Sequence, residues 1–95
     1  MAKFTVRIEL HNATREDYED MYEYLENEGI TDVIVSDKGK KYKLPPAEYN
    51  YEGSATRAQV LETAKECAAK VASSYGVLVT ESKARTWHGL SSAEA

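Results

Sequence analysis

The segment FTVRIEL, from Phe4 to Leu10, alternates apolar and polar side chains at every position. A repeat of two residues is typical of a β-strand, in which successive side chains point to opposite faces of the sheet. The apolar side chains would face a core, and the polar ones, Thr5, Arg7 and Glu9, would face away from it. The segment therefore predicts a sheet with one buried face.

Two amphipathic helices are expected further along the chain. Thr14 can cap the first, which ends at Gly29, and Thr56 can cap the second, where Gln59 completes a capping box. Each helix has one apolar face that is suited to cover the sheet. The residues of these faces are Tyr18, Met21, Tyr22 and Leu25 in the first helix, and Val60, Leu61, Ala64, Cys67, Ala68 and Val71 in the second.

Three further strands are predicted by β-branched or alternating runs at residues 30–35, 47–52 and 77–81. The segment 41–44 is expected to be an arm or a short edge strand, because the two prolines that follow it lack a backbone N–H. Residues 85–88, after the last strand, either extend it or fold back on it.

The element order β-α-β-β-α-β predicts an α+β fold with the ferredoxin-like arrangement. Right-handed crossovers place both helices on one face of a four-stranded antiparallel sheet, with strands 4–10 and 47–52 in its centre. Residues 1–89 would form this single domain, and residues 90–95 a flexible C-terminal tail. The other face of the sheet would have no helix to cover it, so we expect it to meet water, RNA or a second copy of the chain.

The composition favours a reduced, cytoplasmic protein of one domain. The chain has 95 residues, of which 42% are hydrophobic and 29% charged, as in globular proteins. Its one cysteine, Cys67, lies on the apolar face of the second helix and is interpreted as a buried structural thiol. No zinc-binding spacing, cofactor motif or apolar run of membrane-spanning length is present. We therefore expect no metal, no cofactor and no contact with a membrane.

The net charge of −4 conceals a division along the chain. Residues 1–37 hold ten acidic and three basic residues, whereas residues 38–88 hold nine basic and five acidic ones. Four of the lysines fall within six positions, 38–43. These lysines either solubilise a hairpin tip and protect an edge strand or bind a polyanion. Taken as a whole, the negative charge argues against indiscriminate binding of nucleic acid, and no DNA partner is expected.

Cations and aromatic rings are interleaved in this basic segment, as in proteins that bind single-stranded RNA. Lys41 and Lys43 would hold phosphates, and Tyr49 and Tyr51, or Trp87, would stack on bases. Tyr49 and Tyr51 point to the same face of their strand. If this face meets the helices they belong to the core, and if it is the open face they form a platform for bases.

Arg85, His88 and Asp37 are the candidates for catalysis. An imidazole near a guanidinium can act as acid or base on a phosphodiester while the arginine holds the phosphate. In this interpretation Arg85 binds phosphate, and His88 or Asp37 moves protons. Attack by the 2′-hydroxyl needs no cofactor, which would allow a metal-independent endoribonuclease. The alternative is that His88 is an ordinary surface residue.

The segment KYKLPPAEYNYEG, from Lys41 to Gly53, together with the capped helix and the strand Val77–Glu81, resembles the GhoS family of bacterial proteins. That family is related in fold to the Cas2 nucleases, and the resemblance covers roughly residues 3–88. It implies an endoribonuclease that acts on a toxin messenger RNA, as the antitoxin of a type V toxin–antitoxin pair. Cas2-like enzymes carry an aspartate at the end of the first strand, where this chain has Leu10, His11 and Asn12.

The sequence thus predicts a small cytoplasmic RNA-binding protein, with cleavage of toxin messenger RNA as the activity that the resemblance implies. Whether the chain is an enzyme is left open. The alternative is a non-catalytic ferredoxin-like module that forms a homodimer through the open sheet face and binds a protein partner. The acidic first third of the chain favours this alternative. A third possibility is an antitoxin that only binds a toxin.

Overall fold

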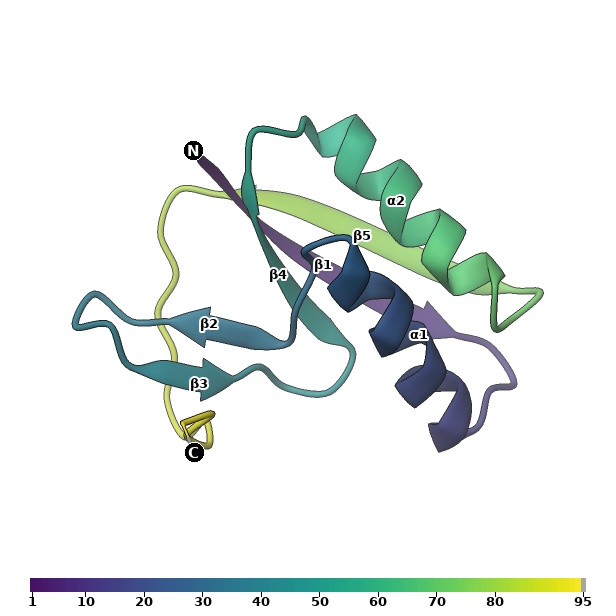
Figure 1. Cartoon of the computed structure of the whole chain (residues 1–95), viewed down its shortest axis with the longest axis horizontal. Helices are drawn as coiled ribbons and strands as arrows, with labels where there is room; N and C mark the ends of the chain where they lie inside the picture. The colour runs from purple at the N-terminus through teal and green to yellow at the C-terminus, as the bar shows by residue number, and fades with distance from the viewer. Residues whose placement is uncertain (95) are drawn as a thin grey trace.

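The computed structural model, which describes residues 1–94, contains the two predicted helices and five strands (Figure 1). Both helices begin where the sequence predicts, because Thr14 and Thr56 each form a complete capping box with the backbone and side chain three residues later. In chain order the elements are β1 (Ala2–Leu10), α1 (Arg15–Asn27), β2 (Val33–Val35), β3 (Lys41–Lys43), β4 (Glu48–Gly53), α2 (Arg57–Ala69) and β5 (Tyr75–Ser82).

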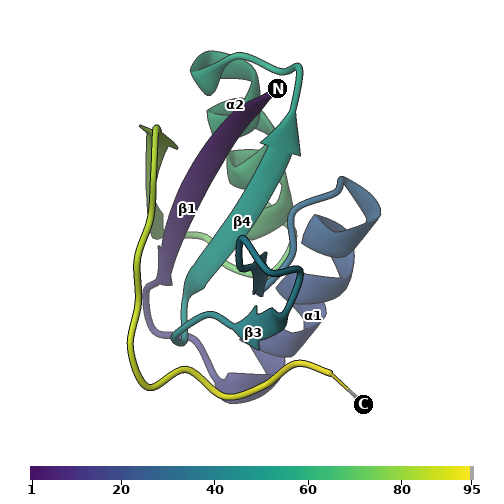
Figure 2. The ribbon, with the colours of Figure 1, turned by 90° about the vertical axis from the view of Figure 1, so that its left-hand side faces the viewer.

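The main sheet has the strand order β4-β1-β5, and both neighbours of β1 run antiparallel to it. The alternation predicted for residues 4–10 is confirmed, because the apolar side chains of β1 are buried and its other side chains are not. Figure 1 and Figure 2 show α1 and α2 on the same side of this sheet. The core lies between these two layers, where β1 contributes Phe4, Val6, Ile8 and Leu10, and the helices contribute Met21, Leu25, Val60, Ala64, Cys67 and Ala68.

The prediction of a four-stranded ferredoxin-like sheet is wrong, although the α+β class is confirmed. β2 does not join β4 but pairs with β3 in a separate antiparallel hairpin. Just before β2, Thr31 forms an isolated bridge to the main sheet, where its N–H donates to the Asn50 carbonyl at 2.9 Å and its carbonyl accepts from the Asn50 N–H at 2.6 Å. A hairpin closed by a short turn orders less chain than a long-range pairing, so β2 pairs with the neighbouring β3. The central strand is therefore β1, and β4 is not central.

Residues 83–94 follow β5 and contact both sheets. After β5 the chain turns back beside the sheet and then crosses to the hairpin (Figure 2). There Ser91 accepts a hydrogen bond from the Lys43 N–H at 2.9 Å, and the Ala93 N–H donates to the Lys41 carbonyl at 3.0 Å. Residues 90–94, expected as a loose tail, thus lie against β3. Position 95 of the predicted tail lies outside the described residues.

Candidate functional site

A cleft of about 430 Å³ lies between the β2–β3 hairpin and residues 83–87. It lies where three parts of the chain meet: the start of β1, the hairpin and the segment that follows β5. Three of the residues singled out from the sequence line this cleft, together with a second aromatic ring and two lysines. These lining residues are Asp37, Arg85 and Trp87, with Tyr42, Lys3 and Lys83.

The aromatic part of the cleft is a pair of rings from distant parts of the chain. Tyr42 and Trp87 meet edge to face, with ring centroids 5.7 Å apart and an angle of 61° between the rings. Both residues are only half-buried. Tyr42 lies on β3, and its neighbours Lys41 and Lys43 hold the C-terminal segment by backbone hydrogen bonds. The hairpin and the C-terminal segment therefore fix the two rings next to each other.

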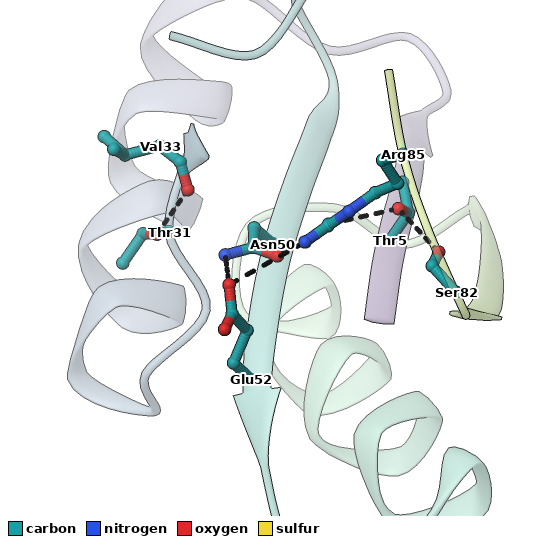
Figure 3. Close-up of polar contacts among 7 residues, drawn as sticks. All are labelled: Thr5, Thr31, Val33, Asn50, Glu52, Ser82 and Arg85. Atoms are coloured by element: carbon teal, nitrogen blue, oxygen red, sulfur yellow. Dashed lines mark hydrogen bonds and ion pairs between the residues drawn. The ribbon is translucent and has the colours of Figure 1, made fainter. Parts of the chain in front are cut away.

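Arg85 lies across the sheet face that no helix covers (Figure 3). Its Nη1 donates to Asn50 Oδ1 at 2.7 Å and to Thr5 Oγ1 at 3.4 Å, and its Nη2 lies 3.7 Å from Glu52 Oε2. Only 16% of the Arg85 side chain is exposed. Burial lowers the pKa of Arg85, and the charge of Glu52 opposes this shift. An arginine remains protonated under such conditions, so the cleft carries a fixed positive charge at this position.

The network around Arg85 extends across all three strands of the main sheet. The Asn50 amide donates to Glu52 Oε2 at 3.3 Å, and the Thr5 and Ser82 hydroxyls lie 3.3 Å apart. Sequence reasoning missed these partners of Arg85. Their signal was present, because Asn50 and Glu52 alternate with the tyrosines of β4 and so face the open side of the sheet. That Arg85 would reach them could not be read from the pattern.

Tyr49 and Tyr51 do not form the platform for bases that was one of the two predicted alternatives. Their register opposite Val6 and Phe4 places both on the apolar side of β1, which faces the helices. Tyr49 is 5% exposed and stacks on Tyr22 with ring centroids 6.2 Å apart, while Tyr51 packs against Phe4 at 5.9 Å. Burial also raises the pKa of Tyr49 to about 12. Both residues therefore belong to the core side of the sheet, which was the other alternative. Because Tyr49 is buried, bases cannot stack on it.

The remaining predicted residues are dispersed. His88 is exposed and does not line the cleft, so the structure does not bring it together with Asp37 and Arg85. Lys43 Nζ forms an ion pair with Asp32 Oδ2 at 2.9 Å, whereas Lys41 is exposed. The structure therefore brings together only two of the three side chains of the predicted catalytic group. Its carboxylate and its guanidinium share the cleft, and its imidazole lies outside.

The charges of the chain are divided in space as they are in sequence. Lys38, Lys40 and Lys41 are exposed on the hairpin, whose tip lies at one end of the molecule (Figure 1). With Lys3 and Lys83 they make the region around the cleft rich in cations. The helix α1 carries six acidic residues and one basic residue, Arg15, and lies away from this tip.

A larger hollow, of about 760 Å³, lies between α1 and the loop that joins β3 to β4. Its polar groups are paired with one another: the Tyr22 hydroxyl donates to Asp32 Oδ1 at 2.9 Å, and Asp32 holds Lys43. Burial is the main cause that raises the pKa of Tyr22 to about 12. This hollow therefore offers apolar surface and few free polar groups.

Searches for a metal site, a membrane-spanning helix and a related protein family do not identify a ligand for the cleft. Within residues 1–94 no three side chains of histidine, cysteine, aspartate or glutamate gather so that they could hold a metal ion. The same part of the chain contains no helix of the length and apolarity needed to span a membrane. No model of a known protein family matches the chain, and no curated protein matches it either.

Proposed function

We propose that this chain is a small cytoplasmic RNA-binding protein that holds single-stranded RNA in the cleft between the hairpin and residues 83–87. The observation that carries the proposal is the composition of the cleft, which is lined by Lys3 and Lys83 as well as by the ring pair of Tyr42 and Trp87. Proteins that bind single strands combine cations along a groove with rings on which bases stack.

The cleft favours a single strand over a duplex, and RNA over DNA. Bases can stack on a protein ring only where they are not already stacked in a helix, as in loops and single strands. The exposed Asp37 lines the cleft, and its carboxylate can accept a hydrogen bond from a 2′-hydroxyl, a group that DNA lacks. Lysines of the hairpin would then contact phosphates on either side of the bound nucleotide.

Fluorescence anisotropy with a short, unstructured, labelled RNA tests this proposal. The variant Lys3→Ala, Lys83→Ala should bind about tenfold more weakly, because two phosphate contacts are lost. The variant Lys65→Ala, Lys70→Ala is the matched control, since it removes the same charge from α2 and its C-cap on the other side of the sheet. Binding that both variants weaken equally would contradict a site in the cleft, and so would a wild type with no affinity for RNA.

A second candidate function is cleavage of the bound RNA, which the position of Asp37 in the cleft favours. The carboxylate would take the proton of the 2′-hydroxyl as its oxygen attacks phosphorus. The bond to the 5′-oxygen would break, and the leaving oxygen would take a proton from water or from another acid. Such an activity would agree with the resemblance to GhoS antitoxins and their toxin messenger RNA substrates.

RNA incubated with the protein and EDTA, and resolved on a denaturing gel, tests cleavage. Asp37→Asn should abolish the activity but keep RNA bound, whereas Asp20→Asn, an exposed position on α1, should cleave like the wild type. Equal cleavage by wild type and Asp37→Asn would remove Asp37 from the mechanism. His88→Ala should retain activity, because His88 lies outside the cleft.

The alternative of a homodimer through the open sheet face receives less support. Arg85 already lies over this face and is held there by Asn50, Glu52 and Thr5. The side chains that remain are largely polar or charged, whereas permanent dimer interfaces are rich in apolar contacts.

A further inference from the structure

The outer edges of the two sheets differ in whether another segment of the chain hydrogen-bonds to them. The outer edge of β4 is covered by Thr31, through two backbone hydrogen bonds with Asn50. The outer edge of β3 is covered by the C-terminal segment, through Ser91 and Ala93. By contrast, β5 pairs only with β1 within residues 1–94, and its other edge has no strand partner among these residues. The main sheet thus has one bare edge.

The sequence of this edge is unprotected against pairing with another strand. Tyr75-Gly76-Val77-Leu78-Val79-Thr80 contains no charge and no proline, and its central residues are strong strand formers. Natural edge strands usually carry lysines, prolines, bulges or inward-pointing charges that prevent such pairing. Leu78, in the middle of the strand, is 62% exposed and lies opposite Arg7, on the side away from the helices. An apolar side chain at this position is suited to contact a partner strand.

We propose that β5 pairs antiparallel with β5 of a second copy of this chain, about a two-fold axis at Leu78. In this register the two Leu78 side chains lie opposite each other, Val77 faces Val79, and Gly76 faces Thr80. The one charged residue of the strand, Glu81, faces Tyr75, so no like charges are opposed. The interface is self-complementary, as a two-fold axis requires.

Glu81 also lies 3.9 Å from Arg57 Nε of its own chain, so its charge is partly balanced before a second copy arrives. The pairing would join two three-stranded sheets into one of six strands, with both α2 helices on the same side. The residues that would pair, Tyr75 to Glu81, do not line the RNA cleft. The pairing therefore does not rest on the proposed function.

Cysteine cross-linking tests both the partner and the register. Leu78→Cys should form an intermolecular disulfide under mild oxidation, because directly opposed residues of antiparallel strands have Cα atoms about 4.5–5.5 Å apart. Thr80→Cys is the matched control, since its two copies would be separated by four residues, or roughly 13 Å along the strands. The wild type provides the background, because its one cysteine, Cys67, is buried. Equal cross-linking at both positions, or none at Leu78→Cys, would overturn the proposed register.

Sedimentation velocity at micromolar concentrations tests the dimer itself. The wild type should sediment as a dimer, and Leu78→Glu as a monomer, because the substitution places two carboxylates opposite each other. The monomer should still fold, since Leu78 is exposed and the new carboxylate would lie across from Arg7. Val35→Glu, at an apolar position of β2 that is 47% exposed, should remain dimeric. A monomeric wild type, or a Leu78→Glu variant that is as dimeric as the wild type, would overturn the proposal.

Discussion

Arg85 donates a hydrogen bond to the Asn50 side chain at 2.7 Å and so joins two segments that are 35 residues apart. Asn50 is 8% exposed, and its backbone also carries the contact between β4 and Thr31. The bond therefore lies between the C-terminal segment, the main sheet and the chain that leads into the hairpin. The position of the cleft depends on these three parts being held together.

Replacing Arg85 with alanine should lower the stability of the fold. The substitution removes charge-assisted hydrogen bonds and leaves the side-chain oxygen of the buried Asn50 without its donor, which costs about 1.5–3 kcal/mol. Arg7→Ala is the matched control on the same face of the sheet, because the Arg7 side chain is 63% exposed and its contact with Glu48 is 3.9 Å long. It should cost less than about 1 kcal/mol. Urea denaturation measures both values.

A double-mutant cycle distinguishes a structural Arg85 from a phosphate ligand. Asn50→Ala and Arg85→Ala should be clearly non-additive in the free energy of unfolding, because each removes the same contact. If Arg85→Ala leaves the free energy of unfolding unchanged and the effects of the two substitutions are additive, Arg85 is not structural. A large loss of RNA affinity in the same variant would then make Arg85 a phosphate ligand.

The buried tyrosines should make the fold sensitive to alkaline pH. The pKa values of Tyr22 and Tyr49 are about 12 in the folded state, against 10.0 for an ordinary tyrosine. The neutral phenol is thus favoured by folding. Its contribution is complete below pH 10 and is lost as the pH rises toward 12, because the unfolded chain releases these protons first. Chemical denaturation at a series of alkaline pH values measures this loss.

Tyr49→Phe identifies the source of the alkaline effect. The free energy of unfolding of this variant should fall less steeply above pH 10 than that of the wild type. Tyr24→Phe, at a position that is 39% exposed, should keep the slope of the wild type. If Tyr49→Phe and the wild type lose stability in parallel, the alkaline loss arises at other groups.

The C-terminal residues should protect the hairpin. Deleting residues 90–95 removes the acceptor of the Lys43 N–H, which is the Ser91 carbonyl. Hydrogen exchange at the Lys43 amide should then accelerate about tenfold, which corresponds to the loss of one hydrogen bond of about 1.4 kcal/mol. The Thr31 amide, bonded to Asn50 in the main sheet, serves as the internal control. An unchanged rate at Lys43 would mean that this segment does not pair with β3 in solution.

Local patterns in the sequence predicted the elements, but not all of their partners. The alternation from Phe4 to Leu10 and the capping residues Thr14 and Thr56 act within a few residues, and the structure confirms them. The pattern of residues 30–35 indicates an extended chain in the same way. It does not say whether that chain pairs with β4 or with β3, because both partners accept the same alternation.

The residues of the candidate site were also predictable only where local sequence was enough to identify them. Asp37, Arg85 and Trp87 could be chosen from the sequence because of their chemistry, and the structure places them in one cleft. The faces of Tyr49 and Tyr51 depended on the register with β1, which a single strand does not reveal. The role of Lys3 in the cleft depends on how the first strand and the segment after the last strand meet, and no short-range pattern encodes that contact.

The most direct test of RNA binding in the cleft is the fluorescence of Trp87, the one tryptophan of the chain, during titration with short single-stranded RNA. If a base stacks in the cleft, the emission of Trp87 should be quenched with saturation. The logarithm of the affinity should fall against the logarithm of the salt concentration with a slope of about −0.7 for each phosphate contact. Emission that does not change at any RNA concentration, or an affinity that salt does not affect, would contradict the account.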